Sequence, residues 1–231
     1  MTTRNLQSDA LGTTRLVQAG DGLVIERDTR TAHALVRWLG RRLAAREAAA
    51  LVALAGVEHV PRLLEFDGAV VRRTFLPGVP LHEAPPRSRA YFVRALRLLR
   101  LVHGAGIAHN DLAKEANWLV APGEHCAIVD FQLATLGTPR RGTTLGSPRR
   151  GTRSAARTAG FRRRAYEDLR HLLKHKRTYQ PQALTARQRR LLARPTAPTR
   201  VWRALVKPLY LFTTRTLLGW PDRAGPAERR S

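Results

Sequence analysis

Two short segments near the middle of the chain carry the side chains best suited to chemistry. They bring carboxylates, an amide, an imidazole and an amine into two neighbouring stretches: His109–Asn110–Asp111, Lys114, Asn117 and Asp130–Phe131. A carboxylate can orient an attacking hydroxyl, carboxylate and amide oxygens can hold Mg²⁺, and cations can surround phosphates. These residue types, in this order, predict phosphate transfer from ATP.

The order of these residues resembles the catalytic and metal-binding loops of the protein-kinase-like superfamily. Asn117 and Asp130 are thirteen positions apart, which matches the usual interval in that family. Five residues separate Asp111 from Asn117, instead of the usual four, and we interpret this as a one-residue insertion. The chain looks closest to small bacterial members, the RIO-type kinases and the lipopolysaccharide-core kinases.

The resemblance implies a role for each of these residues. Asp111 would orient the acceptor hydroxyl, Lys114 would lie near the transferred phosphate, and His109 would brace the loop. Asn117 and Asp130 would be the ligands of Mg²⁺, so ATP and Mg²⁺ are the expected cofactors. The acceptor would be a protein serine or threonine, or a lipid-linked sugar hydroxyl of the lipopolysaccharide core.

The first part of the chain also contains counterparts of the nucleotide-binding residues. Glu47 shares a helical face with apolar residues, where an acidic side chain needs a partner. This predicts that Glu47 is the family's helix glutamate. In the family this glutamate pairs with a strand lysine, and Arg27 stands at the position of that lysine, so Arg27 is the expected partner of Glu47. Gly12 precedes Arg27 at the distance of the glycine-rich loop. Arginine is not equivalent to lysine, and one glycine is few, so a catalytically inactive kinase-like scaffold is the alternative.

The elements expected around these residues indicate an α+β, two-lobed, protein-kinase-like fold, with a small antiparallel sheet followed by a mostly helical part. Residues 1–76 are expected to form the N-lobe and residues 77–231 the C-lobe, joined at a Pro- and Gly-containing hinge. In the N-lobe, strands flank turns at 19–22 and 67–68, and a helix occupies about 31–55. An Arg-, Gly- and Pro-rich repeat at 136–160 is expected to be mobile.

Two features of the C-lobe have more than one interpretation. Asp168, His171 and His175 lie on one face of an expected helix and would suit a metal ion, or Asp168 would brace the catalytic loop as the resemblance implies. The aromatic and leucine-rich stretch 202–220, which includes cations, would pack on the C-lobe or contact the inner membrane peripherally. Thr185 and Gln188 predict a capping box at the start of another helix.

The amino-acid composition says less about the function of the protein than the motifs do. The net charge is +24, and 37 of the 41 basic residues are arginine, a bias that is also typical of GC-rich genomes. A nucleic-acid partner is disfavoured, because no groove-reading module is recognisable and no aromatic residues alternate with the arginines of the repeat. The single cysteine, Cys126, is expected to pack in the core, and the chain is expected to be cytoplasmic.

Overall fold

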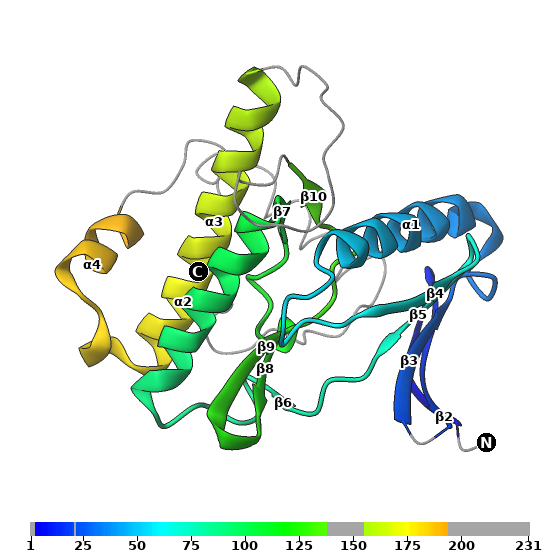
Figure 1. Ribbon diagram of the computed structural model, residues 1–231, viewed down its shortest axis with the longest axis horizontal. Coiled ribbons are helices and arrows are strands. Elements are labelled where there is room, and N and C mark those ends of the chain that lie inside the picture. Colours follow the sequence, from blue (N-terminus) through cyan, green and yellow to red (C-terminus); the bar gives the residue numbers. More distant parts are fainter. Residues whose placement is uncertain (1–2, 21, 138–154, 194–231) are drawn as a thin grey trace, which may run out of the picture.

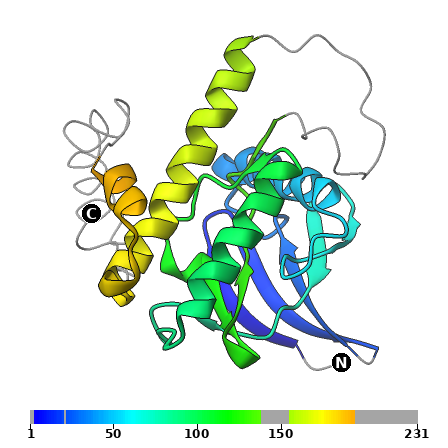
Figure 2. The ribbon, with the colours of Figure 1, turned by 60° about the vertical axis from the view of Figure 1, so that its left-hand side comes forward.

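The protein has a two-lobed α+β fold, as the sequence predicts (Figures 1 and 2). The computed structural model describes residues 3–20, 22–137 and 155–193, without the side chains of residues 155–158. Most of the expected repeat at 136–160 and all of the stretch 202–220 lie outside these residues. The predictions made for those two segments therefore stay predictions.

The small lobe is a five-stranded antiparallel sheet in the order β1-β2-β3-β5-β4. Its strands are β1 (Thr3–Asp9), β2 (Gly12–Ala19), β3 (Gly22–Asp28), β4 (Leu63–Phe66) and β5 (Val70–Thr74). The predicted turns between β2 and β3 and between β4 and β5 are confirmed. At the second turn, Asp67 accepts hydrogen bonds from the backbone N–H groups of Ala69 (2.8 Å) and Val70 (2.6 Å). Strand β1 was not predicted, because all its residues are exposed and no apolar alternation marks it.

Helix α1 (Arg37–Ala53) packs against this sheet with one face. It begins later than the periodicity predicts, because residues 34–36 form a separate 3-10 turn. The inward face of α1 includes Leu43, Glu47 and Leu51, which are all buried. The C-terminal end of α1, at Ala50 and Leu51, joins the main hydrophobic core of the large lobe.

The large lobe combines helices with two small sheets. Its elements are β6 (Val79–Pro80), α2 (Arg89–Gly104), β7 (Ile107–Ala108), β8 (Trp118–Ala121), β9 (His125–Ile128), β10 (Thr135–Leu136), α3 (Ala155–Tyr179) and α4 (Ala186–Leu192). Strands β6, β8 and β9 form one antiparallel sheet, and β7 pairs with β10. The predicted capping box of Thr185 and Gln188 is present at the start of α4. In the described part of the chain, no helix has the length and apolar character needed to cross a bilayer.

The core of the large lobe lies where α2 and α3 meet the strands around the two motif loops. Its largest members, Trp118, Tyr91, Phe92 and Phe131, are almost completely buried. Cys126 belongs to this core, as expected, and burial raises the pKa of its thiol to about 12. The thiol is therefore protonated at neutral pH and is poorly suited to act as a nucleophile.

Candidate active site

The first motif loop connects β7 to β8 and brings three of its side chains together. Asp111 Oδ2 lies 2.7 Å from Lys114 Nζ and accepts a hydrogen bond of 3.1 Å from the side-chain amide of Asn117. The same amide donates to the backbone oxygen of Asp111 at 2.9 Å. A 3-10 turn at Glu115–Asn117 accommodates the extra residue of this loop, so Asn117 reaches Asp111 despite the longer spacing.

His109 is completely buried, and both of its ring nitrogens are used in the site. Nε2 lies 3.0 Å from the backbone oxygen of Val129, which can only accept, so Nε2 carries the proton. Nδ1 is then free to accept the backbone N–H of Asp111 at 3.3 Å. Because Val129 directly precedes Asp130, this imidazole links the two motif loops. The ring also packs against Phe131, with centroids 4.6 Å apart.

Asp168 on α3 holds the same loop through its backbone. Its carboxylate accepts the N–H of His109 at 2.8 Å and the N–H of Asn110 at 2.9 Å. His103 on α2 contacts the same carboxylate at 3.1 Å. This arrangement confirms the interpretation that Asp168 braces the loop. In the described part of the chain, no three metal-ligating side chains gather into a cluster.

Replacing Asp168 with asparagine is expected to destabilise the protein by about 1–3 kcal/mol. The substitution keeps one acceptor oxygen but turns an amide NH₂ toward the second backbone N–H, which then lacks a partner. The midpoint of urea unfolding measures this change. The control is Glu65→Gln, because Glu65 is an exposed acid of β4 in the small lobe whose ion pair with Arg72 is exposed as well. Equal stability of the two variants would contradict the bracing role.

Glu115 is a buried member of the loop that sequence analysis did not identify. It is fully buried, accepts a hydrogen bond of 3.0 Å from the hydroxyl of Tyr179, and lies 3.6 Å from His175 Nδ1. His175 Nε2 is 2.8 Å from the backbone oxygen of Leu112. Both partners come from α3, so this helix supports the loop at a second place besides Asp168. No sequence signal marks Glu115, since nothing in the pattern indicates that a loop acid points inward.

The second motif loop follows β9 and places Asp130 beside the first. The backbone N–H of Val129 donates to the backbone oxygen of Asn117 at 3.1 Å. The side-chain amide of Asn110 donates to the backbone oxygen of Leu133 at 2.7 Å, on the far side of Asp130. Asp130 itself has φ 69°, a left-handed conformation that is uncommon outside glycine and is often found at functional sites.

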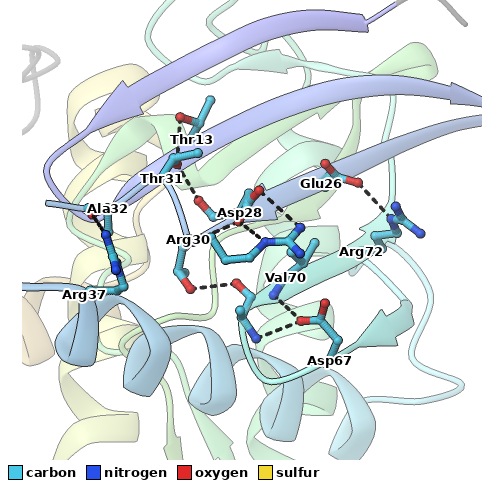
Figure 3. Close-up of polar contacts among 12 residues, drawn as sticks. Thr13, Glu26, Asp28, Arg30, Thr31, Ala32, Arg37, Asp67, Val70 and Arg72 are labelled. Atoms are coloured by element: carbon cyan, nitrogen blue, oxygen red, sulfur yellow. Dashed lines mark hydrogen bonds and ion pairs between the residues drawn. The ribbon is translucent and has the colours of Figure 1, made fainter. Parts of the chain in front are cut away.

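On the small lobe, strand alternation separates outward from inward charges. Figure 3 shows Glu26 of β3 reaching Arg72 of β5, and Asp28 bound to Arg30. Arg72 Nε lies 2.9 Å from Glu26 Oε2, and Arg30 Nε lies 3.0 Å from Asp28 Oδ1. Arg27, between these two acids, and Arg73, next to Arg72, therefore lie on the opposite face of the sheet. Arg27 pairs in register with Val71, and Arg73 with Ile25, so the two arginines are diagonal neighbours on that face.

The partner of the helix glutamate differs from the one that the sequence predicts. Glu47 forms its ion pair with Arg73 of β5, and not with Arg27 of β3. Both arginines face α1, and only the register of β3 with β5 decides which one meets Glu47. The inward position of Arg73, two residues after Val71 on an expected strand, was the signal that could have identified it.

Arg27 is thereby left without a hydrogen-bonding partner for its Nε among the described residues, although this atom is buried. Burial lowers the pKa of Arg73 to about 10; the charge of Asp130 opposes this shift and that of Arg27 adds to it. Arg73 therefore stays protonated at neutral pH. The influence of both charges also shows that Arg73 lies within electrostatic range of Arg27 and of Asp130.

Gly12 has a structural requirement of its own at the β1–β2 turn. Its φ is 131°, and a Cβ there would lie 2.5 Å from the backbone oxygen of Asp28. Glycine therefore allows the start of β2 to approach the end of β3 closely. This packing accounts for the glycine without a ligand, and the expected contact of Gly12 with a nucleotide stays a prediction.

Three buried polar atoms of this region have no hydrogen-bond partner among the described residues. They are Arg27 Nε, Glu47 Oε2 and Asp130 Oδ1. Buried polar atoms are nearly always paired, and a set of one donor and two carboxylate oxygens would suit an anion together with a cation. Asn117 turns its amide nitrogen toward Asp111, so its oxygen faces away from this acid. The donor set therefore fits Mg²⁺ at Asp130 and Asn117 and a phosphate group at Arg27.

Comparison with known proteins places this chain in a protein family. Residues 2–140, more than half of the 231, match the family model APH, described as the phosphotransferase enzyme family. The matched segment contains both motif loops, Arg27, Glu47 and Arg73, and it ends before α3. A search of curated proteins gave no match.

Proposed function

Since the chain belongs to the phosphotransferase enzyme family, we propose that it transfers the γ-phosphate of ATP to a hydroxyl group in a reaction that requires Mg²⁺. The observation that carries the proposal is Asp130 Oδ1, a buried carboxylate oxygen without a partner among the described residues. It lies in a loop fastened to the one that holds Asp111, Lys114 and Asn117. This is the arrangement that phosphate transfer needs.

Each side chain has a defined task in this reaction. Asp111 accepts the proton of the attacking hydroxyl and orients its oxygen toward the phosphorus atom. Lys114 holds Asp111 Oδ2 and places a positive charge next to the site of transfer. His109 fixes the loop by donating to Val129 and accepting from Asp111. Asp130 and Asn117 would hold Mg²⁺, which would neutralise part of the negative charge of the phosphate groups.

In the related kinases one lysine both pairs with the helix glutamate and binds the phosphates of ATP. Here two arginines of the small lobe each take one of these roles. Arg73 neutralises Glu47 and keeps the inner face of α1 on the sheet. Arg27 keeps a buried donor that has no partner among the described residues, and its charge suits a phosphate oxygen. The guanidinium thus substitutes for the lysine ammonium in binding ATP, and the short β1–β2 turn covers the nucleotide less fully than a glycine-rich loop would.

The acceptor is a hydroxyl of a protein serine or threonine, in the manner of the RIO-type kinases. The alternative acceptor is a sugar hydroxyl of the lipopolysaccharide core. Asp111 could accept the proton of either acceptor, because a general base requires only that the acceptor O–H lies within hydrogen-bond reach. Incubation with γ-labelled ATP and each acceptor class, followed by measurement of label transfer, distinguishes them. Binding of ATP without transfer to either class would favour the inactive scaffold.

The proposal is tested by the thermal shift that ATP and Mg²⁺ produce together. At a ligand concentration about 100 times Kd, binding stabilises the native state by about 2.7 kcal/mol. The variant Asp130→Ala is expected to lose the part of this shift that depends on Mg²⁺. Glu83→Ala is the control, because Glu83 is an exposed carboxylate whose ion-pair partner is His82. An undiminished Mg²⁺-dependent shift in Asp130→Ala would contradict the assignment.

A further inference from the structure

The outer face of α1 carries an apolar ridge that nothing in the described part of the chain covers. Its members are exposed and recur at intervals of seven, four and three residues: Trp38, Ala45, Ala49 and Val52. These intervals put all four on one side of a helix with 3.6 residues per turn. Trp38 and Val52 are each 63% exposed, and Leu35, in the turn just before α1, is 80% exposed.

Arginines border this ridge on both sides. At 100° per residue, Arg37 and Arg41 fall on one side of the line from Trp38 to Val52, and Arg42 and Arg46 fall on the other. The single acidic residue of α1, Glu47, lies on the opposite, buried face and is neutralised by Arg73. The outer face of α1 is therefore apolar along its middle and positive along both edges.

Charge complementarity indicates which kind of partner binds this face of α1. A second copy of the chain would bring four arginines against four arginines, which disfavours pairing. A nucleic acid would use the arginines but would leave the aliphatic part of the ridge uncovered. An anionic bilayer satisfies both parts, because Trp and Leu enter the boundary below the headgroups while arginines remain at the lipid phosphates.

We propose that the outer face of α1 docks the small lobe onto an anionic membrane surface. In Figure 1, α1 runs along the edge of the small lobe, and its first turn lies at the end of the molecule remote from α2, α3 and α4. Contact through Leu35 and Trp38 therefore leaves the large lobe free to receive an acceptor. This surface is distinct from residues 202–220, for which the sequence predicts an alternative membrane contact.

Sedimentation of the full chain with vesicles tests the proposal. The wild-type chain is expected to bind vesicles that contain phosphatidylglycerol and not vesicles of phosphatidylcholine alone. The double variant Leu35→Ser/Trp38→Ser is expected to bind the anionic vesicles at least tenfold more weakly. Arg41→Gln/Arg42→Gln is expected to bind them roughly 25-fold more weakly, since each arginine near an anionic surface contributes about a fivefold factor. Salt should weaken wild-type binding as the Debye length falls.

The matched control is Val93→Ser/Leu101→Ser on α2, where two exposed apolar residues also lie near exposed arginines. This control should bind vesicles as the wild type does, and all variants should keep the wild-type circular dichroism spectrum. Should the ridge variant fold poorly, the exposed Arg41/Arg42 variant decides the question. Full vesicle binding by the α1 variants, or an equal loss in the α2 control, would overturn the proposal. So would a wild-type chain that ignores anionic vesicles but dimerises or retains RNA through this face.

Discussion

Replacing Asp111 with asparagine is expected to lower the rate of phosphate transfer by about two to four orders of magnitude. Asparagine fills the same space but cannot accept the proton of the attacking hydroxyl. The rate is measured as the release of label from γ-labelled ATP, with water or an added alcohol as the acceptor. Affinity for ADP should not change, because Asp111 acts on the acceptor and not on the nucleotide.

Measuring the stability of Asp111→Asn distinguishes a loss of catalysis from damage to the structure of the loop. Among the described residues, the Asp111 side chain forms its ion pair with Lys114, and the Lys114 side chain is 55% exposed. Such a pair contributes about 0–1 kcal/mol, so the unfolding midpoint of Asp111→Asn should stay close to that of the wild type. The conservative variant Glu83→Gln is the control for a lost surface charge. A variant that folds normally, binds ADP and retains the full transfer rate would exclude Asp111 as the base.

Separate replacement of Glu47 and Arg73 is expected to cost much more stability than their joint replacement. Each single change, Glu47→Leu or Arg73→Met, leaves one buried charge without its partner and should cost about 3–5 kcal/mol. The double variant removes both charges and should recover most of that loss. Urea unfolding of the four proteins gives the coupling free energy directly.

The same cycle with Arg27 in place of Arg73 distinguishes the two arginines. Arg27→Met should show little coupling to Glu47→Leu, because the ion pair of Glu47 is with Arg73. It should instead weaken the binding of ATP, for which Arg27 Nε is available. Strong coupling between positions 27 and 47, equal to that between 73 and 47, would contradict the observed pairing.

The sequence predicted those parts of the fold that have a local cause. The β2–β3 turn and the capping box of α4 each depend on a few adjacent residues, and both are present. Strand β1 was missed because its residues are exposed on the edge of the sheet and show no alternation. Its place there is decided by pairing with β2, which is a property of the whole sheet.

The site shows the same division between local and long-range causes. The two motif loops were found from residue order, and the structure brings Asp111, Lys114 and Asn117 into contact. The partner of Glu47 was predicted wrongly, because two arginines on neighbouring strands face α1 and sequence spacing does not determine their register. Glu115 was missed, because its burial depends on side chains of α3 more than fifty residues away.

The role of α3 also determines how short a working version of this protein can be. The family match ends at residue 140, yet Asp168, His175 and Tyr179 hold the backbone and side chains of the loop at 109–117. Leu172, on the same helix, belongs to the core of the large lobe. A gene truncated at the end of the family match would therefore encode both motif loops without the helix that holds the first of them. Deletion series and domain transplants should keep the chain at least through Gln180, whose amide donates to the backbone oxygens of Pro86 and Ser88 ahead of α2.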